Sequence, residues 1–253
     1  MAEGIRLQGV SKIYPLAGGE VRALEDLSLF LPRGSFTVVL GRSGSGKTTL
    51  LRLLAGLEEP TKGRISLPRN EGGEGKKPAV GLVFQEPRLM PWLTVEENVA
   101  FSLKGRLGKE EATARVEAML ALLGLEDFRS AYPDQISGGM AQRVALGRTL
   151  AFDPAVVLMD EPLGALDYFT RRRLQGEIAE LHRRTGKTFL LVTHDVEEAL
   201  ALGDSIVVLE AGRVADCLDI PVSRPRETGR PEFLPLRRRV LEAIVGGEHP
   251  PLS

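Results

Sequence analysis

Four short apolar segments, separated by helix-like sequence, constrain most strongly how this chain folds. They lie at residues 36–40, 156–159, 189–192 and 206–209. Uninterrupted apolar strands are typical of a parallel sheet that is covered on both faces, because neither face then meets water. Helical spacing marks the intervening sequence, as in residues 110–123, where Val116, Leu120 and Leu123 lie on one stripe. We therefore predict an α/β fold with a mainly parallel sheet.

Length and composition narrow the class of protein further. The chain has 253 residues, with 33 Lys and Arg against 34 Asp and Glu, and 43% of its residues are hydrophobic. Such a chain can bury a large core and is neither disordered nor fibrous. Proteins that bind nucleic acid usually carry a basic excess, so we predict no nucleic-acid partner. No apolar run approaches the roughly 18 residues that a spanning helix needs, so we expect that the chain does not itself cross a membrane.

The segment Gly-Arg-Ser-Gly-Ser-Gly-Lys-Thr at residues 41–48 follows the first apolar strand and precedes a helical pattern. It fits the phosphate-binding loop, whose glycines let backbone N–H groups turn inward and cradle a polyphosphate at a helix N-terminus. We predict that Lys47 reaches the β- and γ-phosphates and that the Thr48 hydroxyl ligates Mg²⁺. The alternative is a glycine-rich turn with a solvated lysine.

Two other predicted strands end in polar residues. Asp160 and Glu161 follow the strand at residues 156–159, and His194 follows the strand at residues 189–192. The carboxyl ends of parallel strands lie where open α/β sheets bind ligands. We predict that Asp160 holds Mg²⁺ through water, that Glu161 polarises an attacking water, and that His194 hydrogen-bonds a γ-phosphate oxygen. The alternatives are solvated carboxylates at a strand-to-loop junction and a structural histidine.

Ser137, Gly138 and Gly139 precede another helical segment, at residues 140–151. A small hydroxyl and two glycines at a helix start leave N–H groups open to an anion, with no bulky side chain in the way. The three residues are thus a candidate second anion site. The alternative is an ordinary helix N-cap.

In their order along the chain, these motifs resemble the nucleotide-binding subunits of ABC (ATP-binding cassette) transporters. The signature of that family corresponds to Ile-Ser-Gly-Gly-Met-Ala-Gln-Arg at residues 136–143. Four further segments match the family, at residues 84–87, 156–162, 163–167 and 193–195. The resemblance covers residues 4–216. Ile136, Met140 and Gly164 differ from the commoner Leu, Gln and Ser, but none of these changes removes a phosphate-contacting atom.

The resemblance implies a fold and a domain organisation. The expected fold is a P-loop NTPase (RecA-like) core with a mainly parallel sheet, an N-terminal antiparallel β portion and an inserted α-helical subdomain. We place the ATP-binding core in residues 1–86 and 145–216. The helical subdomain with the signature is placed in residues 87–144, and a short C-terminal tail in residues 217–253.

The resemblance also implies a head-to-tail homodimer that encloses two ATP molecules. Each ATP would contact the phosphate loop of one chain and Ser137, Gly138 and Gly139 of the other. Asp167 would lie at the dimer contact. The ATP-binding residues implied within one chain are Tyr14, which stacks on adenine, Gly41, Arg42, Ser43, Gly44, Ser45, Gly46, Lys47, Thr48, Thr49 and Gln85.

Catalytic roles follow from the same resemblance. Glu161 would be the general base, with His194 assisting. Gln85 would join Thr48 and Asp160 around Mg²⁺ and would link the γ-phosphate to the helical subdomain. ATP hydrolysis would then drive a movement that is passed to membrane subunits.

Within the family, residues 90–95, 194–199 and 224–226 resemble importers of nitrate, sulfonate, taurine and bicarbonate. The implied function is ATP hydrolysis that drives uptake of such a small anion through separate permease subunits, with a solute-binding protein as an indirect partner. The chain would then lie at the cytoplasmic face of the membrane. Trp92 and Leu93 would line the groove that receives the permease, with core packing as the alternative for both.

Three other functions compete with this one. The first is the ATPase subunit of another ABC importer or exporter. The second is a soluble ABC ATPase of translation or repair, and the third is a small-molecule kinase that shares only the phosphate loop.

Overall fold

The computed structural model describes residues 3–16, 18–68, 80–164 and 166–245. Ala165 and residues 246–253 of the predicted tail lie outside the described residues. No helix within the described ranges is both long and apolar enough to span a bilayer.

A six-stranded sheet forms the centre of the molecule, with the strand order β5-β6-β7-β3-β8-β9. Its strands are β5 (Val80–Val83), β6 (Val156–Asp160), β7 (Thr188–Thr193), β3 (Phe36–Leu40), β8 (Ser205–Glu210) and β9 (Arg213–Asp219). The pairs from β5 to β8 are parallel, and only the edge pair β8–β9 is antiparallel. The four predicted strands and the mainly parallel sheet are therefore confirmed.

Side chains of β3 show why these strands are apolar throughout. Phe36, Val38 and Leu40 pack into one core cluster, whereas Val39 packs into another on the opposite face. Successive side chains of a strand point to opposite faces, so both faces must be apolar when both are covered.

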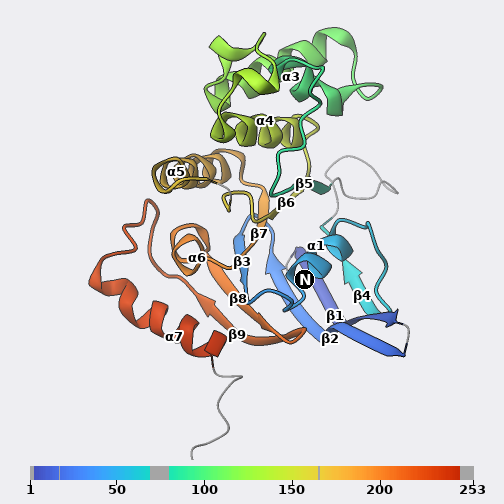
Figure 1. Cartoon of the computed structure of the whole chain (residues 1–253), viewed down its shortest axis with the longest axis vertical. Coiled ribbons are helices and arrows are strands. Elements are labelled where there is room, and N and C mark those ends of the chain that lie inside the picture. The colour runs from blue at the N-terminus through green and yellow to red at the C-terminus, as the bar shows by residue number, and fades with distance from the viewer. Residues whose placement is uncertain (1–2, 17, 69–79, 165, 246–253) are drawn as a thin grey trace, which may run out of the picture.

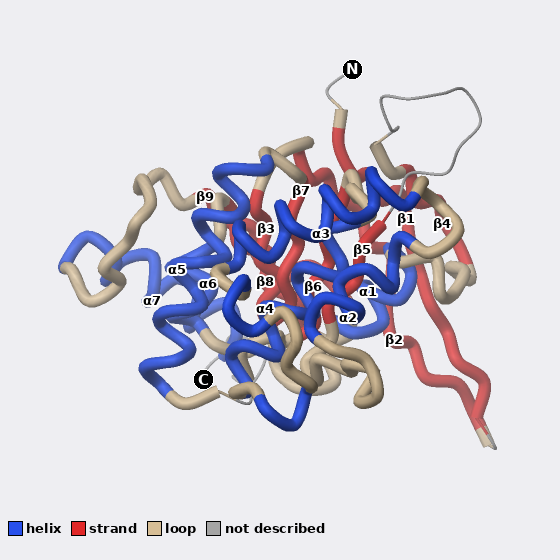
Figure 2. Tube along the Cα trace, turned by 90° about the horizontal axis from the view of Figure 1, so that it is seen from above, coloured by secondary structure: helices blue, strands red, loops and turns tan. Residues whose placement is uncertain are grey.

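A second, three-stranded antiparallel sheet contains the N-terminal strands, in the order β2-β1-β4. Its strands are β1 (Gly4–Leu16), β2 (Gly19–Pro32) and β4 (Lys62–Ser66). Helix α1 (Lys47–Leu54) packs in the same apolar cluster as β1, β2 and one face of the central sheet. Figure 2 shows the far end of the β1–β2 hairpin projecting beyond the helices. The predicted antiparallel portion is confirmed.

The opposite face of the central sheet is covered by α5 (Tyr168–Thr185), α6 (Val196–Leu202) and α7 (Leu234–Val245). Helix α7 lies in the predicted tail, where Phe233 and Val240 are fully buried. The prolines of this tail obscured the helix in the sequence. Pro235 occupies the first turn of α7, where a proline costs little because its missing N–H would have no intrahelical partner.

A helical segment lies at the top of Figure 1, and its last helix packs against the central sheet. Its helices are α2 (Val95–Ala100), η1 (Phe101–Leu103), α3 (Lys109–Leu123), η2 (Glu126–Phe128), η3 (Pro133–Gln135) and α4 (Gly138–Ala151). The segment has its own apolar cluster, which includes Val99 and Leu120.

Helix α4 belongs to two apolar clusters. Val144 packs within the helical segment, whereas Leu146 and Leu150 pack into the core under the sheet. The predicted boundary between residues 144 and 145 falls inside this helix. The division into core and subdomain stays a prediction, with α4 as the element that joins the two.

Candidate nucleotide site

The loop between β3 and α1 has a backbone that requires glycine. Gly46 precedes α1 with φ of 101°, and Gly44 has φ of 80°, a region that other residues rarely adopt. A β-carbon on Gly46 would also lie 2.5 Å from the carbonyl oxygen of Ala23. The loop therefore holds its N–H groups open at the start of α1, as a phosphate cradle requires.

Lys47 lies inside this loop and is only 7% exposed. Its Nζ donates hydrogen bonds to the carbonyl oxygens of Gly41, at 2.7 Å, and Arg42, at 2.9 Å. Burial lowers the pKa of Lys47, while the nearby carboxylates of Glu161 and Asp160 raise it. The result is a shielded ammonium group at the position where phosphate oxygens are expected.

The buried Ser45 hydroxyl provides an independent test of whether the loop fits a phosphate. Its Oγ is buried and has no hydrogen-bond partner among the described residues. Ser45 does not line the cleft that contains Lys47 but a smaller pocket of about 260 Å³ with Leu209 and Ile244, so its hydroxyl is not placed to donate to a phosphate beside Lys47. The loop thus fits a polyphosphate in its backbone shape and its charge, without a contribution from the Ser45 hydroxyl.

Two carboxylates lie at the end of β6, at the same edge of the sheet: Asp160 is its last residue and Glu161 follows it. Asp160 is half-buried, and its pKa is raised first by this burial and then by the charge of Glu161, while Lys47 lowers it. Glu161 has a φ of 43°, which is unusual for a residue other than glycine, and its N–H donates to the Val192 carbonyl oxygen at 3.0 Å. The sharp turn brings its carboxylate toward the end of β7.

His194 follows β7 and meets Glu161 there. Its Nδ1 lies 3.0 Å from Oε2 of Glu161, and 65% of its side chain is exposed. Because most of its side chain is exposed, His194 is not a structural histidine of the core. His182, by contrast, is buried and bonds the Gly34 carbonyl oxygen through Nε2.

A cleft of about 740 Å³ joins these groups. It is lined by Val21, Arg22, Ala23, Arg42, Ser43, Gly44, Gly46, Lys47, Thr48, Thr49, Glu161 and His194. The structure thus brings the phosphate loop together with the predicted base and its histidine, although these motifs lie far apart in the sequence.

Tyr14 was predicted to stack on adenine but is not among the residues that line this cleft. Its hydroxyl donates to Oε2 of Glu58 at 2.5 Å, and its ring lies 5.0 Å from Nζ of Lys12. Val21 pairs with Tyr14 across the hairpin, lines the cleft and is 46% exposed. Val21 and Arg22 were missed because the sequence does not reveal the register of this hairpin. The adenine role of Tyr14 stays a prediction.

Gln85 is exposed and lies beside the turn that follows Glu161. A β-carbon on Gly164 would be 3.3 Å from Nε2 of Gln85. The loop that carries Gln85 is tied to α4, because Gln142 Nε2 donates to the Phe84 carbonyl oxygen at 3.2 Å. Gln85 therefore lies between the catalytic turn and the helical segment, where its predicted linking role would place it.

The predicted dimer residues stay outside the cleft of their own chain. Ser137 is the N-cap of α4 and accepts a hydrogen bond from the Met140 N–H at 3.3 Å. Asp167 caps α5 and accepts from the N–H groups of Phe169 and Thr170, each at 3.1 Å. Within one chain, Ser137 therefore acts as an ordinary helix N-cap, which was the alternative to a second anion site. Ser137 and Gly138 are both exposed, so the turn is open to a second subunit.

A partly buried network beside His194 was missed from the sequence. Arg171 donates to Oδ2 of Asp195 and to the carbonyl oxygen of Leu166, each at 3.2 Å. Asp195 also caps α6, and the Thr193 hydroxyl donates to the carboxylate of Glu198. The network connects the segment before Asp167 to the segment that carries His194.

Glu198 makes the stability of the protein depend on pH. It is 3% exposed, and burial raises its pKa from 4.5 to about 7. The native state then binds a proton more tightly than the unfolded chain. The stabilisation from this group is complete below pH 4.5, falls between 4.5 and about 7, and is lost above that.

Replacing Glu198 with Gln should remove this dependence. We expect the free energy of unfolding of the wild type to fall by about 3 kcal/mol relative to Glu198→Gln as pH rises through this window. Urea unfolding of both proteins at several pH values measures the difference. If the two proteins lost stability in parallel as pH rises, the pKa of Glu198 in the native state would not be raised.

Comparison with known proteins identifies the family. The family model described as "ABC transporter" matches residues 24–164. The chain belongs to the ABC transporter family. An uncharacterized ABC transporter ATP-binding protein of Methanocaldococcus jannaschii is 44% identical, over 95% of this chain and 91% of that protein. An aliphatic sulfonates import ATP-binding protein of Rhizobium johnstonii is also 44% identical, over 96% of this chain and 86% of that protein.

Solved structures of ATP-binding cassettes share the fold. A dimeric cassette in a post-hydrolysis state, bound to ADP and Pi, is 33% identical and superposes with a TM-score of 0.73 over 87% of this chain and all of that one. The cbiO1 cassette from Clostridium perfringens is 25% identical, with a TM-score of 0.78 over 96% of this chain and all of that one.

These likenesses confirm the predicted family, the P-loop NTPase fold and the predicted class of transport ATPase. A kinase that shares only the phosphate loop does not fit, because the similarity extends over almost the whole chain.

Proposed function

We propose that this cassette is the ATP-hydrolysing subunit of an importer for a small organic anion, an aliphatic sulfonate in particular. The cleft carries the proposal, because it holds Lys47 and the Glu161–His194 pair at one edge of the sheet. The choice of solute is supported by relatives of 42 to 44% identity that are named for the import of aliphatic sulfonates.

ATP binding in this cleft would use the loop N–H groups and Lys47. Phosphate oxygens would replace the carbonyl oxygens of Gly41 and Arg42 as acceptors for Nζ of Lys47. Since Lys47 is shielded from water, its attraction to a polyphosphate is stronger than that of an exposed lysine. The loop therefore orients the terminal phosphate toward Glu161.

Mg²⁺ is the further cofactor that we propose, held by Thr48, Asp160 and Gln85. Thr48 is exposed at the cleft and Asp160 is half-buried beside it, so oxygen ligands of the kind that Mg²⁺ prefers are present. A cation beside Asp160 would favour its ionised form and oppose the effect of burial on its pKa. When bound, the ion would neutralise negative charge on the phosphates.

Glu161 would accept the proton of the attacking water. Its Oε2 already contacts His194, which would keep the carboxylate oriented and help to hold the terminal phosphate. A second subunit would bring its Ser137 turn to the same ATP, as the exposure of that turn allows. Closure and release of this homodimer would be the movement that drives transport.

The membrane partner would dock on the helical segment. Trp92 is 70% exposed there, while Leu93 is half-buried, so Trp92 is not a core residue. A large exposed aromatic side chain that follows the loop carrying Gln85 suits a protein interface. We place the cassette at the cytoplasmic face of the membrane, on permease subunits that receive the solute from a binding protein.

Uptake of labelled ethanesulfonate by a strain that lacks this gene tests the proposal. We expect the wild-type gene to restore uptake and Glu161→Gln to leave it at background. Unchanged sulfonate uptake in the deletion strain, with loss of nitrate or bicarbonate uptake, would overturn the solute but keep the ATPase. A purified protein that releases no phosphate from ATP with Mg²⁺ would overturn the ATPase.

A further inference from the structure

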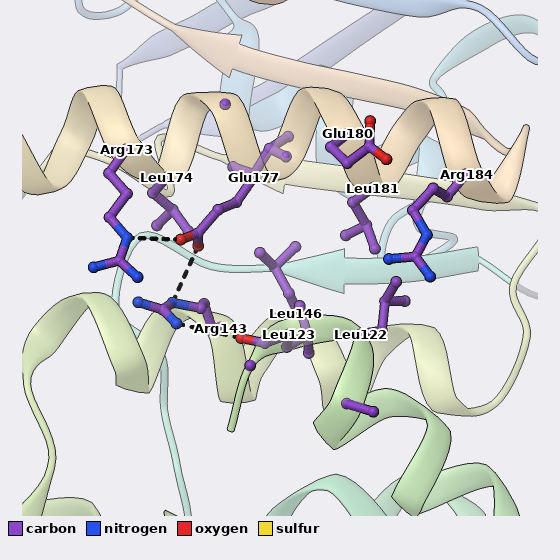
Figure 3. Close-up of a pocket in the computed structure, with 14 residues that line it drawn as sticks. Leu122, Leu123, Arg143, Leu146, Arg173, Leu174, Glu177, Glu180, Leu181 and Arg184 are labelled. Carbon is purple, nitrogen blue, oxygen red and sulfur yellow. Dashed lines mark hydrogen bonds and ion pairs between the residues drawn. The ribbon is translucent and has the colours of Figure 1, made fainter. Parts of the chain in front are cut away.

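Helices α4 and α5 face each other across a cavity of about 550 Å³. Leu146 on α4 and Leu123 at the end of α3 line one side, and Leu174 and Leu181 on α5 line the other (Figure 3). Leu146, Leu174 and Leu181 pack in one apolar cluster, and the contacts at the edge of the cavity add to this packing in holding α4 against α5.

The first such contact lies at the start of both helices. A β-carbon on Gly139 would be 2.7 Å from Cγ2 of Thr170, so the backbone of α4 lies directly against α5 there. Beyond this contact and the apolar cluster that includes Leu146, α4 packs against α2 and α3 of its own segment. A polar contact further along α4 would therefore fix its angle to α5 more closely.

Arg143 supplies that polar contact, one turn further along α4. Its Nε lies 3.1 Å from Oε2 of Glu177 on α5. Its Nη1 also donates to the carbonyl oxygen of Leu123, at the C-terminal end of α3, at 3.3 Å. One side chain thus connects α4, α3 and α5, as Figure 3 shows.

The ion pair is shielded from solvent. The side chain of Arg143 is 14% exposed and that of Glu177 is 32% exposed. Nε of Arg143 and Oε2 of Glu177 are themselves buried and have no partner other than each other among the described residues. Separating them would leave Nε of Arg143 and one oxygen of Glu177 without a partner, which is unfavourable, although Glu177 would keep its contact with Arg173.

Arg173 offers a natural comparison. Its Nε contacts the other oxygen of Glu177 at 3.0 Å, but both residues lie on α5 and Arg173 is 71% exposed. An exposed pair within one helix adds little to stability and does not connect two helices.

We infer that Arg143 is a positioning residue, whose ion pair with Glu177 fixes the direction in which the Ser137 turn faces the partner subunit. Ser137 caps the same helix six positions before Arg143, about 9 Å along its axis. A change in the angle of α4 therefore moves this turn. The inference rests on the proposed head-to-tail dimer, in which the turn meets ATP on the other subunit.

The test uses ATP-dependent dimer formation in a Glu161→Gln parent, measured by light scattering over a range of ATP concentrations. Arg143→Met, which keeps an apolar stem but no charge, should raise the ATP concentration for half-maximal dimerisation about tenfold or more. Arg173→Met should stay within about twofold of the parent, because it removes only the contact within α5. Arg143→Lys, which keeps the charge but not the contact with Leu123, should give an intermediate value.

Two further measurements separate positioning from a general loss of structure. Binding of a fluorescent ATP analogue to the monomer should be unchanged in Arg143→Met, because Arg143 does not line the nucleotide cleft. The reversed pair, Arg143→Glu with Glu177→Arg, should recover much of the dimerisation that Arg143→Glu alone loses.

The outcomes are distinguishable. Normal dimerisation of a folded Arg143→Met, or no recovery in the reversed pair, would overturn the positioning role. A Glu161→Gln parent that stays monomeric with ATP would instead overturn the proposed dimer, and this inference with it.

Discussion

Replacement of Glu161 with Gln is expected to lower the rate of ATP hydrolysis by about a hundredfold or more. The amide cannot accept a proton from water, while its size and its position beside His194 are nearly unchanged. ATP should still bind, because the loop and Lys47 are untouched. The variant should therefore accumulate as an ATP-bound dimer.

Phosphate release under saturating ATP measures this loss. Glu242→Gln is a suitable control, since Glu242 is 63% exposed on α7 and pairs with Arg238 on the same helix. We expect the control to hydrolyse ATP at the wild-type rate. Hydrolysis by Glu161→Gln at that same rate would show that another group accepts the proton.

Replacement of Lys47 with Ala is expected to weaken ATP binding by about a hundredfold. Each hydrogen bond to a charged group contributes about 1.5 to 3 kcal/mol, and Lys47 can offer two to the phosphates in a site shielded from water. The same change leaves the carbonyl oxygens of Gly41 and Arg42 without their present donor. Both effects act on the loop and not on the catalytic turn.

Equilibrium titration with a fluorescent ATP analogue measures the affinity. Lys62→Ala, an exposed lysine on β4, controls for the loss of one positive charge. Thermal unfolding without nucleotide should show that both variants are folded. An affinity of Lys47→Ala within about threefold of the wild type would contradict the geometry proposed for the loop.

Local sequence patterns were sufficient for the elements that position the phosphate loop. Phe36–Leu40 is apolar at every position because both faces of β3 are covered, and this pattern needs no knowledge of the rest of the fold. The loop itself is specified by glycines at Gly44 and Gly46, where the backbone has positive φ. Such features are visible in a single window of sequence.

Features that depend on how distant segments meet were not predictable from those patterns. Val21 enters the cleft only because the hairpin register places it opposite Tyr14. Arg143 and Glu177 are 34 positions apart and become partners only when α4 packs against α5. Glu198 looks like any acidic residue near a helix start until the packing around α6 buries it.

Cross-linking between two subunits tests most directly the claim that the Ser137 turn of one chain caps ATP on the other. The exposed Cys217 is first replaced by Ser, and Glu161→Gln is used to retain ATP. One protein then carries Ser137→Cys and a second carries Ser43→Cys in the phosphate loop. We predict a cross-linked pair of the two proteins that forms with ATP and is absent without it. Failure of ATP to promote this cross-link, in proteins that bind ATP normally, would contradict the account.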